Sequence, residues 1–163
     1  MKKYIYIILF FAIVTNWDIV SRVLGFSGNK YTIGNYTSEK WHFGHTGYSE
    51  AMKVSDQNEA PAIIYMYTDW CQYCKKFESK LLTNNEVNTS LARFVKIKIN
   101  PETNDKDKQL YKQLNGKGYP TIMFKQGANG KLTYVRAPYT KNAKGWQLMS
   151  ANQFVTMLHK HGS

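Results

Sequence analysis

The feature that most constrains the fold is a dense apolar and aromatic run, AIIYMYT, at residues 62–68. Its apolar side chains are continuous rather than alternating with polar ones, which indicates a strand buried on both faces. Such a strand lies inside a sheet that is covered on both sides, and helices are the usual cover. The chain is therefore expected to be an α/β protein.

The rest of the chain alternates between helical and strand patterns. Strands that are separated by helices start a mainly parallel sheet, whereas two strands joined by a short glycine-rich turn must be antiparallel. The pattern predicts a mixed central sheet flanked by helices. The predicted elements are a short strand at 41–43, a helix at 49–58 capped by Ser49, the strand at 62–68, a helix from Cys71 to about Leu82, a strand at 93–99, a helix at 104–114, two strands within 121–137, and a helix at 150–161 with a Ser150–Gln153 capping box.

The N-terminus has the pattern of an export signal. Two lysines follow Met1, and an apolar run covers residues 4–14. A basic start before a short apolar run is typical of secretory signals. The run is shorter than the stretch of about 20 apolar residues that spans a bilayer. We expect a signal peptide over residues 1–25, with an uncleaved anchor that associates with the membrane through residues 4–20 as the alternative.

The remaining chain divides into two parts. Residues 26–48 are rich in Gly, Asn, Ser and Thr and are predicted to be a linker or irregular entry segment. Residues 49–163 have the length and apolar content of one folded domain. Export, which we expect to be to a bacterial periplasm, would place this domain where disulfides form and persist.

The charge is strongly positive and unevenly distributed. The formal net charge is +11, and no acidic residue follows Asp107. This basic third is either a solvated surface or a surface that meets an acidic partner or anionic lipid. The basic residues are mostly spaced singly and no nucleic-acid motif is visible, so nucleic-acid binding is not predicted.

The two cysteines of the chain, Cys71 and Cys74, form a Cys-x-x-Cys motif at the predicted strand-to-helix junction. Cys71 falls at a helix N-terminus, where free N–H groups and the helix dipole favour a thiolate. A thiolate is the species that attacks a disulfide. Cys74 lies one turn further on and faces the core, so it is expected to be the shielded, resolving thiol.

These residues resemble the thioredoxin family. Trp70 and Lys75 flank the cysteines as in its Trp-Cys-x-x-Cys-Lys turn, and the GYPT stretch at 118–121 is similar to its cis-proline loop. The longer string TDWCQYCKKFE is similar to the thioredoxin-like end domain of transmembrane thiol:disulfide interchange proteins of the DsbD type. The resemblance covers about residues 49–161 and implies the thioredoxin fold.

The resemblance also implies roles for individual residues. Pro120 would be the cis-proline, and the backbone of Tyr119 would pair with a substrate peptide. Thioredoxins carry a buried acid six residues before the first cysteine, where this chain has Tyr65. Glu78 matches a glutamate of the DsbD type and either replaces that acid as a proton acceptor or is a surface charge paired with a neighbouring lysine. Trp70 would pack beside the disulfide, and Lys75 would favour the thiolate.

The sequence therefore predicts an exported thiol–disulfide oxidoreductase that acts on protein thiols and disulfides. We expect it to act as a reductase, and an oxidase or isomerase role is the next choice. It would exchange electrons with a redox partner protein and need no organic cofactor. The alternative is a metal-binding or adaptor module of the same fold. Such a module would combine the cysteines with histidines of the HFGH or HKH stretches, His42 and His45 or His159 and His161.

Overall fold

The computed structural model describes residues 40–135, 138–143 and 145–162. Five strands form one sheet in the order β1-β3-β2-β4-β5. They are β1 (Trp41–Phe43), β2 (Ala62–Met66), β3 (Val95–Ile99), β4 (Thr121–Lys125) and β5 (Leu132–Val135). β3 pairs in parallel with β1 and β2, whereas β4 pairs antiparallel with β2 and β5. The predicted mixed sheet is confirmed.

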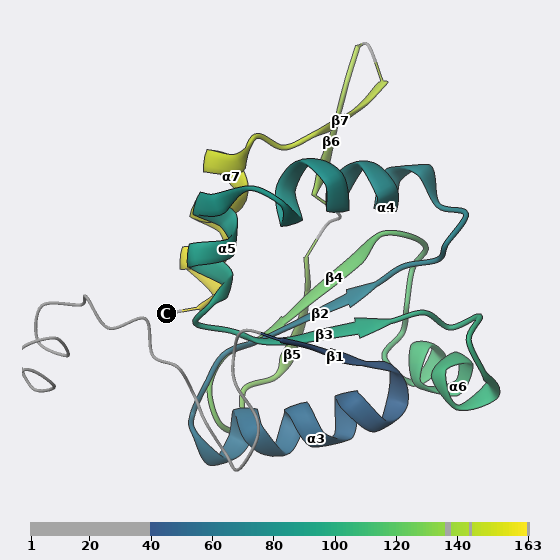
Figure 1. Cartoon of the computed structure of the whole chain (residues 1–163), viewed down its shortest axis with the longest axis vertical. Helices are drawn as coiled ribbons and strands as arrows, with labels where there is room; N and C mark the ends of the chain where they lie inside the picture. The colour runs from purple at the N-terminus through teal and green to yellow at the C-terminus, as the bar shows by residue number, and fades with distance from the viewer. Residues whose placement is uncertain (1–39, 136–137, 144, 163) are drawn as a thin grey trace, which may run out of the picture.

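Helices cover both faces of this sheet (Figure 1). α3 (Gly44–Gln57) and α6 (Asp105–Gln113) lie on one face. The other face carries α4 (Gln72–Phe77), the π-helical turn η1 (Glu78–Leu82), α5 (Asn85–Leu91) and α7 (Ala151–His161). The cap of α7 is as predicted, because Ser150 and Gln153 form a capping box.

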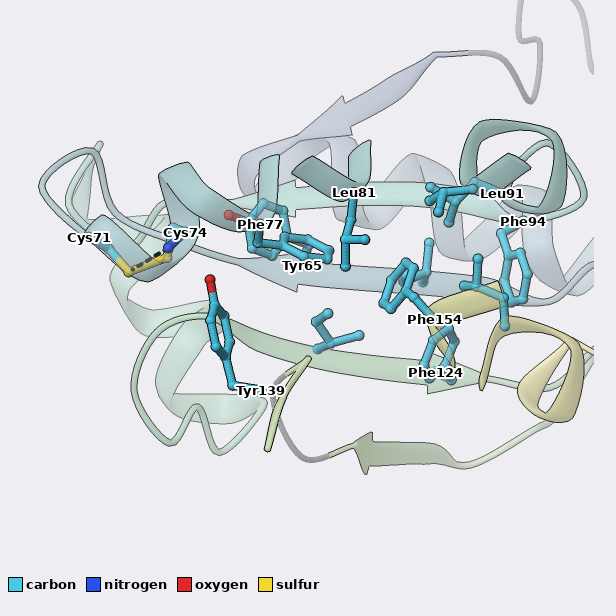
Figure 2. Packing of buried hydrophobic residues seen from close by; sticks show 14 residues of the cluster. Tyr65, Cys71, Cys74, Phe77, Leu81, Leu91, Phe94, Phe124, Tyr139 and Phe154 are labelled. Carbon is cyan, nitrogen blue, oxygen red and sulfur yellow. Dashed lines mark hydrogen bonds between the residues drawn. A yellow bond between two sulfur atoms is a disulfide. The ribbon is translucent and has the colours of Figure 1, made fainter. Parts of the chain in front are cut away.

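The central strand β2 is buried throughout, as its continuous apolar pattern predicts. Tyr65 points into the core beneath α4, α5 and α7, with Phe77 and Phe154 (Figure 2). Ile63 belongs to the same buried cluster. The intervening Ile64 belongs to the second core, on the α3 side. β2 is therefore packed on both faces of the sheet. Cys71 follows the carboxyl end of this central strand.

The predicted N-cap at Ser49 is wrong, because α3 already begins at Gly44. The cap comes from a distant residue: the His45 backbone N–H donates to Asp107 Oδ1 at 2.6 Å. Gly44 has a φ of +64°, and a Cβ atom there would lie 2.8 Å from Asp107 Oδ2. Sequence proximity does not reveal a cap that depends on α6. The described fold thus starts at β1, inside the segment 26–48 that the sequence predicts as a linker or irregular entry.

Two further regions were not predicted from the sequence. α5 begins after Asn84, whose side chain accepts hydrogen bonds from the Glu86 and Val87 N–H groups. A separate two-stranded hairpin, β6 (Tyr139–Asn142) and β7 (Gly145–Leu148), precedes α7 and pairs only with itself among the described strands. We call it the β6–β7 hairpin; it stands beside α4 in Figure 1.

The predicted signal or anchor at residues 1–25, and most of the predicted linker, lie outside the described residues. Among the helices that are described, none combines the length and the apolar character needed to cross a membrane.

Candidate functional site: the Cys71–Cys74 disulfide

Cys71 and Cys74 form a disulfide at the start of α4, with their Cα atoms 5.2 Å apart. Cys71 is the N-cap residue, and the Cys74 backbone N–H donates to Cys71 Sγ at 3.1 Å. A sulfur at this place takes the role that a Ser or Asp oxygen has at other helix starts. Cys71 is 4% exposed and Cys74 is 1% exposed, so both sulfurs are shielded and Cys74 is the deeper one. When reduced, Cys71 has an N–H donor that stabilises its thiolate.

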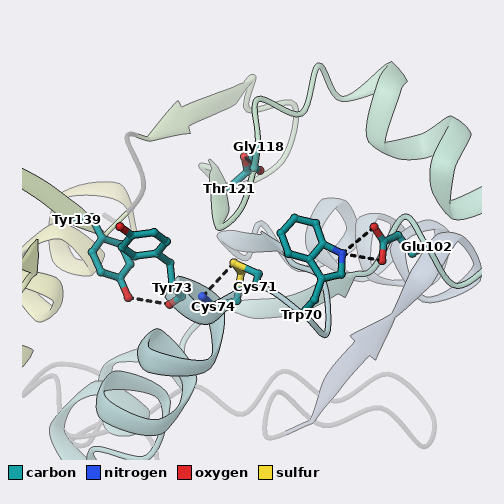
Figure 3. Close-up of a disulfide and its surroundings, with 8 residues drawn as sticks. All are labelled: Trp70, Cys71, Tyr73, Cys74, Glu102, Gly118, Thr121 and Tyr139. Atoms are coloured by element: carbon teal, nitrogen blue, oxygen red, sulfur yellow. Dashed lines mark hydrogen bonds between the residues drawn. A yellow bond between two sulfur atoms is a disulfide. The ribbon is translucent and has the colours of Figure 1, made fainter. Parts of the chain in front are cut away.

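Two exposed aromatic side chains flank the disulfide (Figure 3). On one side is Trp70, 61% exposed, whose Nε1–H donates to both carboxylate oxygens of Glu102 at 2.9 and 3.0 Å. On the other side is Tyr73, the second residue between the cysteines. The indole of Trp70 is therefore held by a charge-assisted hydrogen bond rather than by burial. Lys75 lies exposed on α4.

The loop before β4 lies against the turn that carries Trp70, Cys71 and Cys74, which we call the Cys turn. Trp70 and Tyr119 meet edge to face, with ring centroids 6.0 Å apart. The Tyr119–Pro120 peptide bond is cis. Thr121 pairs with Met66 at the end of β2, which fixes the loop next to the Cys turn. Burial raises the pKa of the Tyr119 hydroxyl to about 12, with Tyr111 adding to the effect, so it stays protonated at neutral pH.

Tyr65, at the position of the acid that thioredoxins carry, is fully buried. Within the described residues its hydroxyl has no hydrogen-bond partner. Burial raises its pKa, and the negative charge of Glu78 adds to this, so the phenol cannot serve as a base near neutral pH. Its ring packs edge to face on Phe77 at 5.1 Å, which makes Tyr65 a core residue beneath α4.

Glu78 follows Cys74 by one helical turn, and its backbone N–H donates to the Cys74 carbonyl. Its carboxylate forms an ion pair with Lys98 at 2.8 Å, rather than with Lys75. The Lys98 ammonium lies 5.1 to 5.6 Å from three ring centroids, those of Trp41, Tyr65 and Tyr67. Such cation–π contacts hold a partly buried ammonium in place. Glu78, the first residue of η1, is thus a half-buried carboxylate held by Lys98 from β3.

Sequence reasoning missed Glu102, the partner of Trp70, and it also missed Tyr139. The Tyr139 hydroxyl, on β6, donates to the Tyr73 carbonyl at 2.7 Å, and the two rings meet edge to face at 5.0 Å (Figure 3). Burial raises the pKa of Tyr139 to about 12, so the donor stays protonated at neutral pH. A contact across 66 residues leaves no local signal in the sequence.

The histidines do not gather into a metal centre in the described part of the chain, where no three His, Cys, Asp or Glu side chains come together as a metal site. His161 instead stacks on Phe124, with ring centroids 4.8 Å apart.

A disulfide at the helix start that follows the central strand β2, next to a loop with a cis-proline, is the arrangement of the thioredoxin fold. A family model described as a thioredoxin-like domain matches residues 48–158. The chain therefore belongs to the thioredoxin-like domain family.

Individual relatives agree with this assignment. The thiol:disulfide interchange protein DsbD of Escherichia coli strain K12 is 32% identical over 106 residues, which cover 55% of this chain and 19% of DsbD. The match thus spans about a fifth of the length of that relative.

Solved structures share the fold. The reduced DsbD C-terminal domain of Neisseria meningitidis has a TM-score of 0.56 at 20% identity, covering 73% of this chain and 98% of that one. A thioredoxin from Thermus thermophilus has a TM-score of 0.55 at 21% identity, covering 74% of this chain and 85% of that one.

Proposed function

We propose that the protein is an exported reductase of protein disulfides, with Cys71 as nucleophile and Cys74 as resolving thiol. The observation that carries this proposal is the Cys71–Cys74 disulfide at the start of α4, with Cys71 Sγ accepting the Cys74 N–H. The similarity to DsbD and the signal-like N-terminus support a place in the bacterial periplasm, either soluble or anchored.

The reaction begins with the reduced protein. The Cys71 thiolate attacks one sulfur of a substrate disulfide, the substrate S–S bond breaks, and the first substrate thiolate leaves. Cys74 then loses its proton and attacks Cys71 Sγ, which releases the second substrate thiolate and forms the Cys71–Cys74 disulfide. The substrate gains two electrons and its thiolates take up two protons. A dithiol redox partner protein returns the protein to its reduced form.

The cis-proline loop is proposed to hold the substrate. In this account the backbone of Tyr119, before Pro120, hydrogen-bonds to the substrate polypeptide beside its cysteine, as the thioredoxin resemblance implies. Trp70, tied to Glu102, would cover the opposite side of the attacked sulfur. Both assignments use groups that the fold already holds next to the Cys turn. Lys75 would favour the Cys71 thiolate through its charge.

The wild-type protein is expected to catalyse reduction of insulin by dithiothreitol. A catalytic amount should shorten the lag before the insulin B chain precipitates, and protein alkylated after reduction is the matched control. Because we propose a reductase, equilibration with dithiothreitol should give a potential nearer to the about −270 mV of thioredoxin than to the about −120 mV of the oxidant DsbA. A lag equal to that with dithiothreitol alone rules out the proposed function, and a potential near that of DsbA reverses its direction.

We further propose that Glu78 accepts the Cys74 proton, because Tyr65 carries no charge at neutral pH and Glu78 lies one turn beyond Cys74. General bases typically contribute about 10²–10⁴-fold. A thiol proton is already fairly acidic, so we expect a smaller effect here, of about tenfold. Glu78→Gln should slow resolution of a preformed mixed disulfide at neutral pH and leave the first attack unchanged.

The pH profile separates this role from a structural one. Resolution by Glu78→Gln should recover as the pH rises, because hydroxide then removes the thiol proton. Glu86→Gln, an exposed glutamate on α5, is the matched control. Equal resolution rates in wild type and Glu78→Gln across the pH range would leave Glu78 as only the partner of Lys98.

A further inference from the structure

A pocket of about 280 Å³ lies beside the disulfide, between the Cys turn, the cis-proline loop and the β6–β7 hairpin. We call it the hairpin pocket. Its walls include Tyr73, Pro120, Tyr134, Tyr139 and Trp146. Small-molecule pockets usually measure about 300–1,000 Å³, so this space lies just below the lower end of that range and has room for a large side chain. Tyr119 and Pro120, which also line it, belong to the cis-proline loop that is proposed to hold the substrate, whereas Tyr134 and Trp146 have no role in the reaction described above.

The hairpin is fixed to the Cys turn but is not part of the main sheet. The hydrogen bond from Tyr139 to Tyr73 joins the two, and the Met149 N–H donates to the Pro138 carbonyl to close the base of the hairpin. The β6–β7 pair forms a sheet of its own. Trp146 is therefore presented beside the disulfide without being used to close the core.

Exposed aromatic side chains gather at this place. The described residues include five exposed large hydrophobic side chains, and Trp70, Tyr73, Tyr134 and Trp146 line the hairpin pocket or flank the disulfide. Tyr134 and Trp146 are 40% and 47% exposed. Exposed apolar groups that cluster around a reactive pair mark a contact surface for a partner. Since Tyr73 lies between the cysteines, a polypeptide whose sulfur reaches Cys71 passes this pocket.

The two sides of the disulfide differ in charge. Lys117 is the charged residue of the hairpin pocket, and its ammonium lies 5.4 Å from the Tyr134 ring centroid. No acidic residue follows Asp107 in the chain, so β5, β6, β7 and the cis-proline loop carry none. On the Trp70 side, by contrast, Asp69 and Glu102 are exposed. A ligand in the hairpin pocket therefore meets aromatic rings and positive charge.

We propose that the hairpin pocket binds the substrate segment that flanks the attacked cysteine, and that it selects a large aromatic or aliphatic side chain accompanied by an aspartate or glutamate. This inference rests on the proposed function and adds a substrate class to it. The apolar side chain would pack against Tyr134 and Trp146, and the carboxylate would pair with Lys117. Acidic, apolar segments of protein substrates would thus be reduced in preference to basic ones.

The test uses four short peptides in which Phe or Gly precedes a central cysteine and Glu or Lys follows it. Each is joined by a disulfide to 2-mercaptoethanol, and release of the peptide thiol by the reduced full-length protein is followed by chromatography. Pockets for apolar side chains discriminate by about 10–200-fold, so we expect Phe to be preferred over Gly by at least about tenfold. Exposed ion pairs contribute little, so we expect Glu to be favoured over Lys by about 1.4- to fivefold.

Variants assign these preferences to the hairpin pocket. Trp146→Ala should remove the preference for Phe, and Lys117→Glu should reverse the preference for Glu. Phe43→Ala and Lys53→Glu, an exposed aromatic on β1 and an exposed lysine on α3, are the matched controls and should keep both preferences. Equal rates for all four peptides, or an unchanged Phe preference in Trp146→Ala, would overturn the proposal.

A small substrate separates failure of this inference from failure of the proposed function. Bis(2-hydroxyethyl) disulfide has no side chain to fill the pocket, so wild type, Trp146→Ala and Lys117→Glu should reduce it at equal rates. If wild type reduces it without peptide preference, the oxidoreductase remains and the pocket proposal is wrong. If sedimentation shows a dimer that Trp146→Ala dissociates, a second copy of the chain occupies the pocket instead, which also overturns the proposal.

Discussion

Cys71→Ser is expected to reduce insulin no faster than dithiothreitol alone. A serine hydroxyl is not ionised at neutral pH and does not form a disulfide, so neither the mixed disulfide nor the Cys71–Cys74 bond can arise. The assay is the turbidity of the precipitating insulin B chain, with wild type and variant at equal concentration.

The loss should not come from unfolding. A serine oxygen at position 71 still accepts the Cys74 N–H, as N-cap oxygens do, so α4 keeps its cap. The circular dichroism spectrum of Cys71→Ser should match that of reduced wild type. If a folded Cys71→Ser retains much of the wild-type rate, the nucleophile is another group and the assignment of Cys71 fails.

Cys74→Ala is expected to accumulate covalent complexes with its substrates. Cys71 still attacks, but the deeper sulfur that would release the substrate is gone. The mixed disulfide then persists until an external thiol cleaves it. The measurement is the appearance, on non-reducing gels, of bands of higher mass that disappear when a reductant is added. The double variant Cys71→Ser with Cys74→Ala is the control and should capture nothing. Equal capture by wild type and Cys74→Ala would show that Cys74 does not resolve the intermediate.

Much of the fold follows from local patterns. The continuous apolar character of β2 predicts a strand covered on both faces, and the structure confirms it. The capping box at Ser150 predicts the start of α7, which is also confirmed. In both cases the deciding interaction lies within a few residues or within one element, so the sequence displays it directly.

The errors occur where distant residues decide. α3 starts at Gly44 because the Asp107 carboxylate accepts the His45 N–H, a contact across 62 residues. The β6–β7 hairpin is separate from the main sheet, its strands have four residues each, and β6 is polar after Tyr139, so the apolar alternation that reveals a strand is too brief. Gly145, with a φ of +105°, marked its turn and was the one local signal available.

The site divides in the same way. Spacing and position identify the disulfide pair, because two cysteines three residues apart at a strand-to-helix junction lie at one helix start. The partners of the site do not follow from spacing. Glu78 pairs with Lys98 from β3, and Tyr73 meets Tyr139 from β6, so both contacts depend on how the elements pack.

The most direct test of the central claim, that Cys71 is the attacking sulfur, is to map the sulfur that captures a substrate. Cys74→Ala and Cys71→Ala are each mixed, in reduced form, with a peptide disulfide, and the rate and position of the mixed disulfide are read by mass spectrometry. We predict rapid capture through Cys71 in Cys74→Ala and little capture through the buried Cys74 in Cys71→Ala. Capture through Cys74 at an equal or higher rate would contradict the account.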